Sequence, residues 1–178
     1  MVTVFGQPST PKIISLSLDG NQFEIYNKIS RNYSHSFLFE SLTGPEELAE
    51  TSIMGFDPEF IVKGYYDRIT IENRDGNVET VTTTDPLNKI KELVLKTSDQ
   101  TYRYLGGAVG HINYDAIRLW EKIPKNHPIN EPIMEFGIYT DGILFDNKQK
   151  KSFYFYYERN RVDEIKSSES KFDEFTMS

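Results

Sequence analysis

The fold class is decided by residues 60–83, which read FIVKGYYDRITIENRDGNVETVTT. Near the middle of this stretch lies Asp75-Gly76, a dipeptide that supplies the positive φ needed where a chain reverses. The apolar and β-branched residues on either side predict strands at residues 60–66, 68–72 and 78–83. Neighbouring strands joined by such a short turn pair antiparallel, so this stretch predicts an antiparallel sheet.

Further strands and a few helices are expected on both sides of this stretch. The expected strands are residues 13–18, a buried strand at 36–40, residues 52–56, and a hairpin of residues 133–145 and 152–158. Three helices are expected from apolar spacing and start signals, at residues 22–31, 84–96 and 115–122, the last with Ile117 and Trp120 facing inward. Strands outnumber helices, and the predicted fold class is α+β, dominated by antiparallel strands.

The length and composition limit the number of domains that the chain can form. A chain of 178 residues suits one domain with a real core. Polar residues prevail from about position 159 onward, which is typical of a linker or an acidic tail. We therefore expect one domain over residues 1–160 and a linker over residues 161–178.

The charge and the cysteine count exclude several classes of function. The formal net charge of −7 argues against a nucleic-acid backbone as the main partner. The chain has no cysteine, which rules out disulfides, thiolate nucleophiles and cysteine-bound zinc. Its start does not resemble a signal peptide, and no stretch approaches the roughly 20 apolar residues of a membrane span. We expect no membrane association and a cytoplasmic location.

Residue chemistry alone reveals no catalytic centre. The three histidines, His35, His111 and His127, are isolated from one another, and no Gly-x-Ser-x-Gly elbow surrounds any serine. Glycines at 106, 107 and 110 lack the spacing of a phosphate-binding loop, and they are more typical of close packing or a bulge in a strand. A binding or regulatory role is therefore expected.

Three segments, in this order, resemble the amino-terminal region of the anthranilate synthase component I family. They are residues 37–41 (FLFES), residues 52–58 (SIMGFDP) and residues 106–124 (GGAVGHINYDAIRLWEKIP). The third is similar to the family's Gly-Gly-x-x-Gly-Tyr-x-x-Tyr-Asp-x-x-Arg-x-x-Glu-x-x-Pro run, with His111 at the first tyrosine position. Its matching residues are Gly106, Gly107, Gly110, Tyr114, Asp115, Arg118 and Glu121.

The resemblance implies a fold, an activity and partners. The fold would be the amino-terminal part of an α/β sandwich, with residues 161–178 leading to an absent carboxy-terminal portion. In the family that portion binds chorismate and Mg²⁺ and carries the catalytic acid–base groups. A glutamine amidotransferase subunit, component II, delivers ammonia, and the products are anthranilate and pyruvate. This part of the enzyme is expected to be inactive alone, with no catalytic residue and no metal of its own.

The resemblance also implies the tryptophan feedback site. It transfers onto Glu40 and Ser41 and onto the segment that includes Glu50, Thr51 and Ser52. An amino-acid ligand needs a carboxylate for its ammonium group, donors for its carboxylate and an apolar slot for its indole ring. Many relatives have arginine where this chain has Glu50, and this reversal of charge changes how a ligand carboxylate would be held.

Three other interpretations stay open at this level, one of them an unrelated β-rich scaffold. The sister enzyme aminodeoxychorismate synthase component I shares these motifs, and a stand-alone amino-acid-binding module would need no enzymatic portion. If strands shared with the rest of an enzyme are missing, an exposed apolar face and self-association into an oligomer are also expected.

Overall fold

The computed structural model describes residues 9–41, 51–99, 101–124 and 131–167. The chain divides into two compact units, and each is built on a five-stranded sheet. Described parts of residues 58–96 and 107–139 form unit 1, and described parts of residues 9–57, 97–106 and 140–178 form unit 2. All strand pairs within the two sheets are antiparallel, so the predicted α+β class is confirmed.

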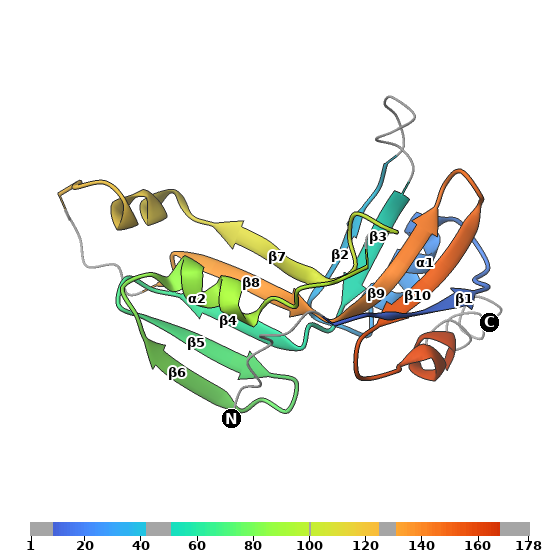
Figure 1. Cartoon of the computed structure of the whole chain (residues 1–178), viewed down its shortest axis with the longest axis horizontal. Coiled ribbons are helices and arrows are strands. Elements are labelled where there is room, and N and C mark those ends of the chain that lie inside the picture. The colour runs from blue at the N-terminus through green and yellow to red at the C-terminus, as the bar shows by residue number, and fades with distance from the viewer. Residues whose placement is uncertain (1–8, 42–50, 100, 125–130, 168–178) are drawn as a thin grey trace. The chain divides into compact units, whose positions relative to one another are not determined.

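The sheet of unit 1 contains the stretch that predicted the fold. Its strand order is β6-β5-β4-β8-β7 (Figure 1). The predicted turn is present, with Gly76 at a φ of 78° and the Asn73 side chain accepting hydrogen bonds from the backbone of Asp75 and Asn77. The strands are β4 (Phe60–Gly64), β5 (Arg68–Asn73), β6 (Val78–Thr82), β7 (Gly107–Ile112) and β8 (Met134–Tyr139).

Helix α2 (Pro86–Leu93) packs on this sheet and closes the core of unit 1. The Asp85 side chain accepts a hydrogen bond from the Asn88 backbone N–H, and Pro86 begins the helix. Ile90 and Leu93 are buried against the apolar residues of β4, β5 and β8. The helix ends at Leu93 rather than near residue 96, because Val94 is already extended.

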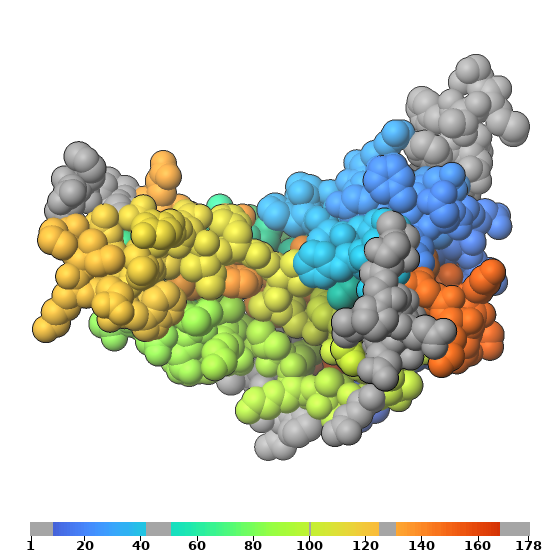
Figure 2. All heavy atoms as spheres, turned by 90° about the horizontal axis from the view of Figure 1, so that it is seen from above, coloured from blue at the N-terminus to red at the C-terminus, as the bar shows by residue number. Residues whose placement is uncertain are grey.

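The segment after β7 differs from the expected helix. Residues Tyr114–Leu119 form a 3₁₀ helix, η1, in which Ala116 is the buried residue. Trp120 was expected to face inward but is 61% exposed, and Tyr114 is 86% exposed. A 3₁₀ helix has three residues per turn, so it does not present the α-helical face from which Trp120 was placed. The surface of this segment is seen in yellow in Figure 2.

The sheet of unit 2 has the strand order β1-β10-β9-β3-β2. Helix α1 covers one face, where Ile25 and Ile29 pack against Met54, Phe56 and Ile143. Leu105 and neighbouring tyrosines cover the other face, with Leu144 and Phe155 buried beneath them. The elements are β1 (Lys12–Leu16), α1 (Gln22–Ser30), β2 (Ser36–Phe39), β3 (Thr51–Phe56), β9 (Asp141–Asp146) and β10 (Lys151–Tyr156).

Two predictions about the strands were wrong. Residues 133–145 were expected to be one arm of a hairpin, but β8 ends at Tyr139 and β9 begins at Asp141, in a different sheet. Thr140 is followed by Asp141-Gly142, a dipeptide that can mark a chain reversal, and the prediction did not use this signal. The strand at residues 36–40 was expected to be buried, yet β2 is an edge strand and Phe39 is 54% exposed.

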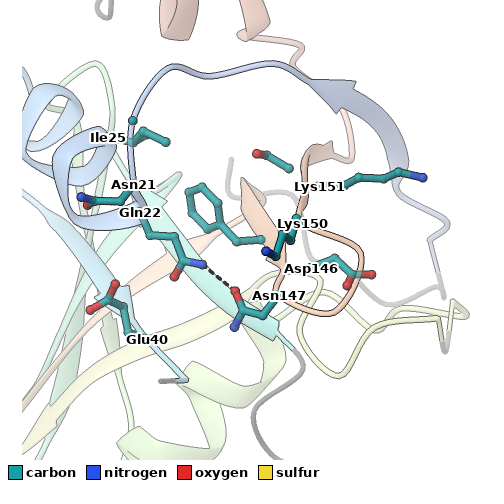
Figure 3. A pocket seen from close by; sticks show the side chains of 11 residues that line it. Asn21, Gln22, Ile25, Glu40, Asp146, Asn147, Lys150 and Lys151 are labelled. Carbon is teal, nitrogen blue, oxygen red and sulfur yellow. Dashed lines mark hydrogen bonds between the residues drawn. The ribbon is translucent and has the colours of Figure 1, made fainter. Parts of the chain in front are cut away.

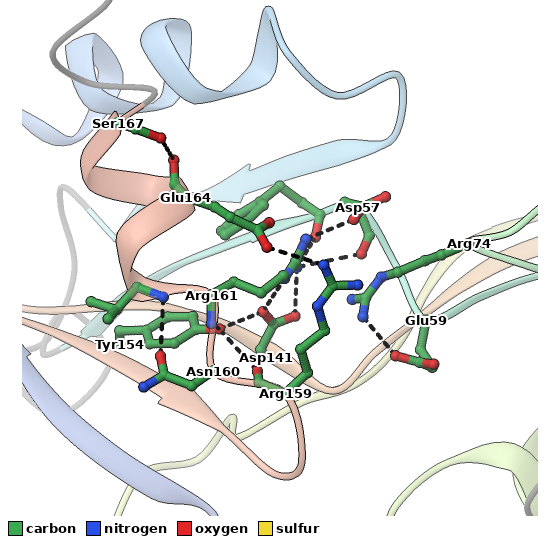
Figure 4. A network of polar contacts seen from close by, with 12 residues as sticks. Asp57, Glu59, Arg74, Asp141, Tyr154, Arg159, Asn160, Arg161, Glu164 and Ser167 are labelled. Carbon is green, nitrogen blue, oxygen red and sulfur yellow. Dashed lines mark hydrogen bonds and ion pairs between the residues drawn. The ribbon is translucent and has the colours of Figure 1, made fainter.

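The residues assigned to a linker begin with a buried arginine (Figure 4). The Arg161 guanidinium donates two hydrogen bonds of 2.8 Å to the Asp141 carboxylate and one of 2.6 Å to Asp57. The Tyr154 hydroxyl donates to Asp141 at 2.7 Å, and burial, with the Asp141 charge, raises the pKa of Tyr154. Residues 162–167 are helical, with Ile165 in the core. The folded part of unit 2 therefore reaches at least residue 167.

Replacing Arg161 with methionine should lower the free energy of unfolding by about 3–5 kcal/mol, because Asp141 would keep a buried charge without its partner. Arg159→Met is the matched control. Arg159 pairs with Glu164 at the surface, and its side chain is 59% exposed, so its loss should cost less than about 1 kcal/mol. Urea denaturation measures both, and equal costs would show that the Arg161 network does not stabilise unit 2.

Candidate functional site

A pocket of about 440 Å³ lies in unit 2, within the size range of about 300–1,000 Å³ that ligand sites occupy. It is bordered by the start of α1, the end of β2 and the loop between β9 and β10 (Figure 3). Its lining residues are Gly20, Asn21, Gln22, Ile25, Glu40, Phe145, Asp146, Asn147, Lys150, Lys151 and Ser152.

The start of α1 places Gln22 on the pocket wall. Asn21 is the N-cap, and its side chain accepts a hydrogen bond of 3.0 Å from the Glu24 backbone N–H. The Glu24 carboxylate in turn accepts a bond of 2.9 Å from the Asn21 N–H, which completes a capping box. These two bonds hold the first turn of α1 in place, and Gln22 is its first residue.

The opposite wall is the four-residue loop that joins β9 to β10. The Asp146 carboxylate accepts a hydrogen bond of 2.7 Å from the Gln149 N–H, which holds the loop closed. Lys150 adopts a left-handed conformation with a φ of 53°, a conformation uncommon outside glycine. The Lys151 ammonium donates to the Gln149 side chain at 3.3 Å, and its side chain extends away from the pocket in Figure 3.

A chain of hydrogen bonds, which we call the amide relay, connects β2 and β3 to α1 through this loop. The Ser52 hydroxyl oxygen accepts bonds of 3.1 Å from the Ser41 N–H and from the Asn147 side chain. The Asn147 side chain also donates to the Ser41 carbonyl oxygen at 3.2 Å. Its own carbonyl oxygen accepts a bond of 2.5 Å from Gln22 (Figure 3). The amide relay therefore consists of Ser52, Ser41, Asn147 and Gln22.

The relay leaves one polar atom without a partner. The Gln22 side-chain oxygen is buried and has no hydrogen-bond partner in the part of the chain that the structure describes. An unpaired buried carbonyl of this kind costs about 1–3 kcal/mol. Gln22 and Glu40 both line the pocket, so a second acceptor group lies close by.

The lining residues suit a small ligand that carries both charges. Glu40 and Asp146 are acidic, and Lys150 is basic, while Ile25 and Phe145 contribute apolar surface. A carboxylate and a carbonyl oxygen accept hydrogen bonds from an ammonium group, and a lysine pairs with a carboxylate. The pocket can therefore bind an amino acid through its charged ends, with apolar atoms beside it.

The structure brings most of the predicted ligand residues to this site. Glu40 lines the pocket, and Ser41 and Ser52 belong to the amide relay behind it. Thr51 pairs with Asp146 across β3 and β9 but does not line the pocket. Glu50 lies outside the described residues.

Sequence reasoning missed Gln22, Asn147 and Lys150. Gln22 is a polar residue at a helix start, and Asn147 follows an Asp in a hairpin turn, which is where such residues occur for local reasons alone. The two lie 125 positions apart and meet only through the fold. No signal in a single sequence marks that meeting.

Gly106 of the glycine-rich family motif belongs to unit 2 and the rest of the motif to unit 1, and none of its residues lines the pocket. Gly106 and Gly107 have φ values of 93° and 143°. A Cβ on Gly110 would lie 2.0 Å from the Glu135 carbonyl oxygen, so the predicted close packing is found there. The motif's charged and aromatic residues occupy or follow η1: Tyr114 is exposed, Asp115 pairs with Arg118 at 3.3 Å, and Glu121 is exposed.

The described residues contain neither a cluster of metal-ligating side chains nor a membrane-spanning helix. No group of three or more histidine, aspartate or glutamate side chains in that part of the chain could hold a metal ion. No helix among the same residues is long and apolar enough to cross a membrane.

Fold and pocket define an α+β protein with a pocket lined by charged, polar and apolar side chains. No protein-family model matches the chain. It is 33% identical to anthranilate synthase component 1 of Methanothermobacter thermautotrophicus over 80% of this chain and 30% of that protein. It is 32% identical to the protein of the same name from Methanothermobacter marburgensis, over 92% of this chain and 35% of the relative.

The solved anthranilate synthase component I of Streptococcus pneumoniae TIGR4 is 26% identical to this chain. The match covers 76% of this chain and 31% of the solved chain, with a TM-score of 0.48. The chain spans about a third of the length of the curated relatives that it matches. On the sequence identities it belongs to the anthranilate synthase component I family, as a segment of such a protein.

Changing Asn147 to aspartate should disrupt the amide relay. The new carboxylate oxygen would face the Ser41 carbonyl oxygen, which now accepts a hydrogen bond, and the expected loss of unfolding free energy is about 1–3 kcal/mol. Asn77→Asp, at an exposed turn position, is the control and should change stability by less than about 0.5 kcal/mol. Thermal unfolding followed by circular dichroism compares them, and an unaffected Asn147→Asp protein would contradict the relay.

Proposed function

We propose that the chain is the amino-terminal, regulatory part of anthranilate synthase component I and that its pocket is the L-tryptophan feedback site. One observation carries the proposal. Glu40, which the family resemblance marks for tryptophan, lines a pocket that carries both charges, and Ser41 and Ser52, marked in the same way, are hydrogen bonded to each other behind it.

Tryptophan fits the chemistry of this pocket. Its ammonium group pairs with Glu40, its carboxylate pairs with Lys150, and its indole ring packs on Ile25 and Phe145. The buried Ser52 and the backbone of Ser41 hold the end of β2 in place behind Glu40. In this assignment Ser41 positions the site and Glu40 binds the ligand.

The remaining functions belong to the complete enzyme. It would form anthranilate and pyruvate from chorismate, with ammonia from a glutamine amidotransferase partner, component II. Mg²⁺ and the catalytic acid–base groups would be held by the portion outside this chain, so this part is expected to be inactive alone. We also expect a cytoplasmic enzyme that forms an oligomer.

Feedback inhibition requires that tryptophan prefer an inactive state of the enzyme. A ligand shifts an equilibrium between two states only through its different affinity for them. A change in the loop between β9 and β10 would alter both Lys150 and the amide relay, because Asn147 and Lys150 lie in that loop. We propose this loop as the element whose arrangement tryptophan binding selects.

Glu40→Gln should weaken L-tryptophan binding by about 10-fold, since a neutral amide replaces the carboxylate that pairs with the ligand ammonium. Isothermal titration calorimetry on the complete gene product measures the affinity. Inhibition of anthranilate formation should shift to higher tryptophan concentrations by the same factor. Glu79→Gln, an exposed change on β6, is the control for a lost negative charge.

The same experiment decides between the open alternatives. A wild-type protein that binds no tryptophan would refute the feedback site. Formation of aminodeoxychorismate instead of anthranilate would assign the chain to the sister enzyme. Tryptophan binding by a gene product that makes neither compound would favour a stand-alone binding module.

A further inference from the structure

We infer that Gln22 selects for the free ammonium group of the ligand, through its unpaired side-chain oxygen. This inference rests on the proposed amino-acid site and adds to it a residue outside the family motifs. The Gln22 oxygen is the buried pocket atom that lacks a hydrogen-bond partner among the described residues.

The amide relay determines which end of Gln22 is unpaired. The Ser41 carbonyl oxygen can only accept a hydrogen bond, so the Asn147 NH₂ group must face it. The Asn147 oxygen then faces α1, where it requires a donor. The NH₂ group of Gln22 supplies this donor at 2.5 Å, and the Gln22 oxygen is left over. The backbone carbonyl of Ser41, after the end of β2, thus fixes the unpaired group on α1 as an acceptor.

This acceptor is held ready for a ligand. Asn147 is hydrogen bonded to Ser41, Ser52 and Gln22, so the Gln22 amide cannot turn over without breaking the relay. The Gln22 oxygen is buried, so a ligand donor reaches it only when the side chains that cover it move aside. A ligand N–H group that contacts Gln22 would donate a hydrogen bond to this otherwise unpaired side-chain oxygen.

A primary ammonium is the donor that suits this wall. Glu40 lines the same pocket and contributes a negative charge, which favours a cation over a neutral hydroxyl or amide. An ammonium group has three N–H donors, enough for the Gln22 oxygen and the Glu40 carboxylate together. Figure 3 shows both side chains at the pocket, Gln22 from α1 and Glu40 from the end of β2.

The test combines three ligands with two variants. L-Tryptophan and tryptamine carry the ammonium group, whereas indole-3-propionate has the same ring and a carboxylate without it. Gln22→Met keeps the length of the side chain but removes the acceptor. Gln149→Met is the matched control, because Gln149 lies in the same loop as Asn147 but does not line the pocket. Calorimetry on the complete gene product gives each affinity, with competition titrations for the weak ligands.

Gln22→Met should weaken L-tryptophan and tryptamine by about 10- to 100-fold, the effect of losing a hydrogen bond to a charged group. Indole-3-propionate should change by less than about 3-fold, because it never used the acceptor. Gln149→Met should leave all three affinities unchanged. Melting curves for each variant confirm that the comparison is made on folded protein.

Other outcomes overturn the inference in distinguishable ways. Equal weakening of all three ligands by Gln22→Met would make Gln22 a structural residue of the relay. Unchanged binding of tryptophan would show that the acceptor is not used. Failure of the wild-type protein to bind tryptophan would instead refute the proposed amino-acid site, and this inference with it.

Discussion

The pairing of β3 on both of its edges is the constraint on which unit 2 depends. β3 is hydrogen bonded to β2 on one side and to β9 on the other. This places Ser52, fully buried, between the end of β2 and the loop that follows β9. The pocket wall at Glu40 and the loop at Asn147 are close together only because β3 lies between their strands. If β3 slipped by one residue, Ser52 would move to the other face and the relay would have no centre.

The second constraint is the cost of burying Arg161. A guanidinium removed from water requires charged partners, and Asp141 and Asp57 provide them from the start of β9 and the residue after β3. The same arginine is stacked near the Phe56 ring, at 4.8 Å from its centroid. The Arg161 side chain therefore connects the segment after β10 to β3 and β9, which lie beside the site. The helical residues that follow, 162–167, are held against the core by this anchor and by Ile165.

The site and the family membership share Glu40, Ser41 and Ser52, but each also rests on residues that the other does not use. Sequence identity to anthranilate synthase component 1 extends over 80–92% of the chain in the two archaeal relatives. The pocket, in contrast, is defined by the hydrogen bonds of a few residues in unit 2, and two of them, Gln22 and Asn147, belong to no motif. A regulatory pocket needs an affinity that differs between two states of the protein. Lys150, in a left-handed conformation, shares the loop between β9 and β10 with Asn147 of the amide relay, so one rearrangement of this loop would change both.

The sequence by itself determined the local elements and the family. The Asp75-Gly76 turn, the strands around it, the N-cap of α2 and the motif at residues 106–124 follow from local backbone preferences and residue order, which a sequence records directly. It also marked Glu40, Ser41 and Ser52. Only the tertiary structure decided that residues 133–145 divide between two sheets, that Trp120 faces outward and that Arg161 is buried. The pairing of Gln22 with Asn147 belongs to the same group, because contacts between residues 125 positions apart depend on strand order and register, which no local pattern specifies.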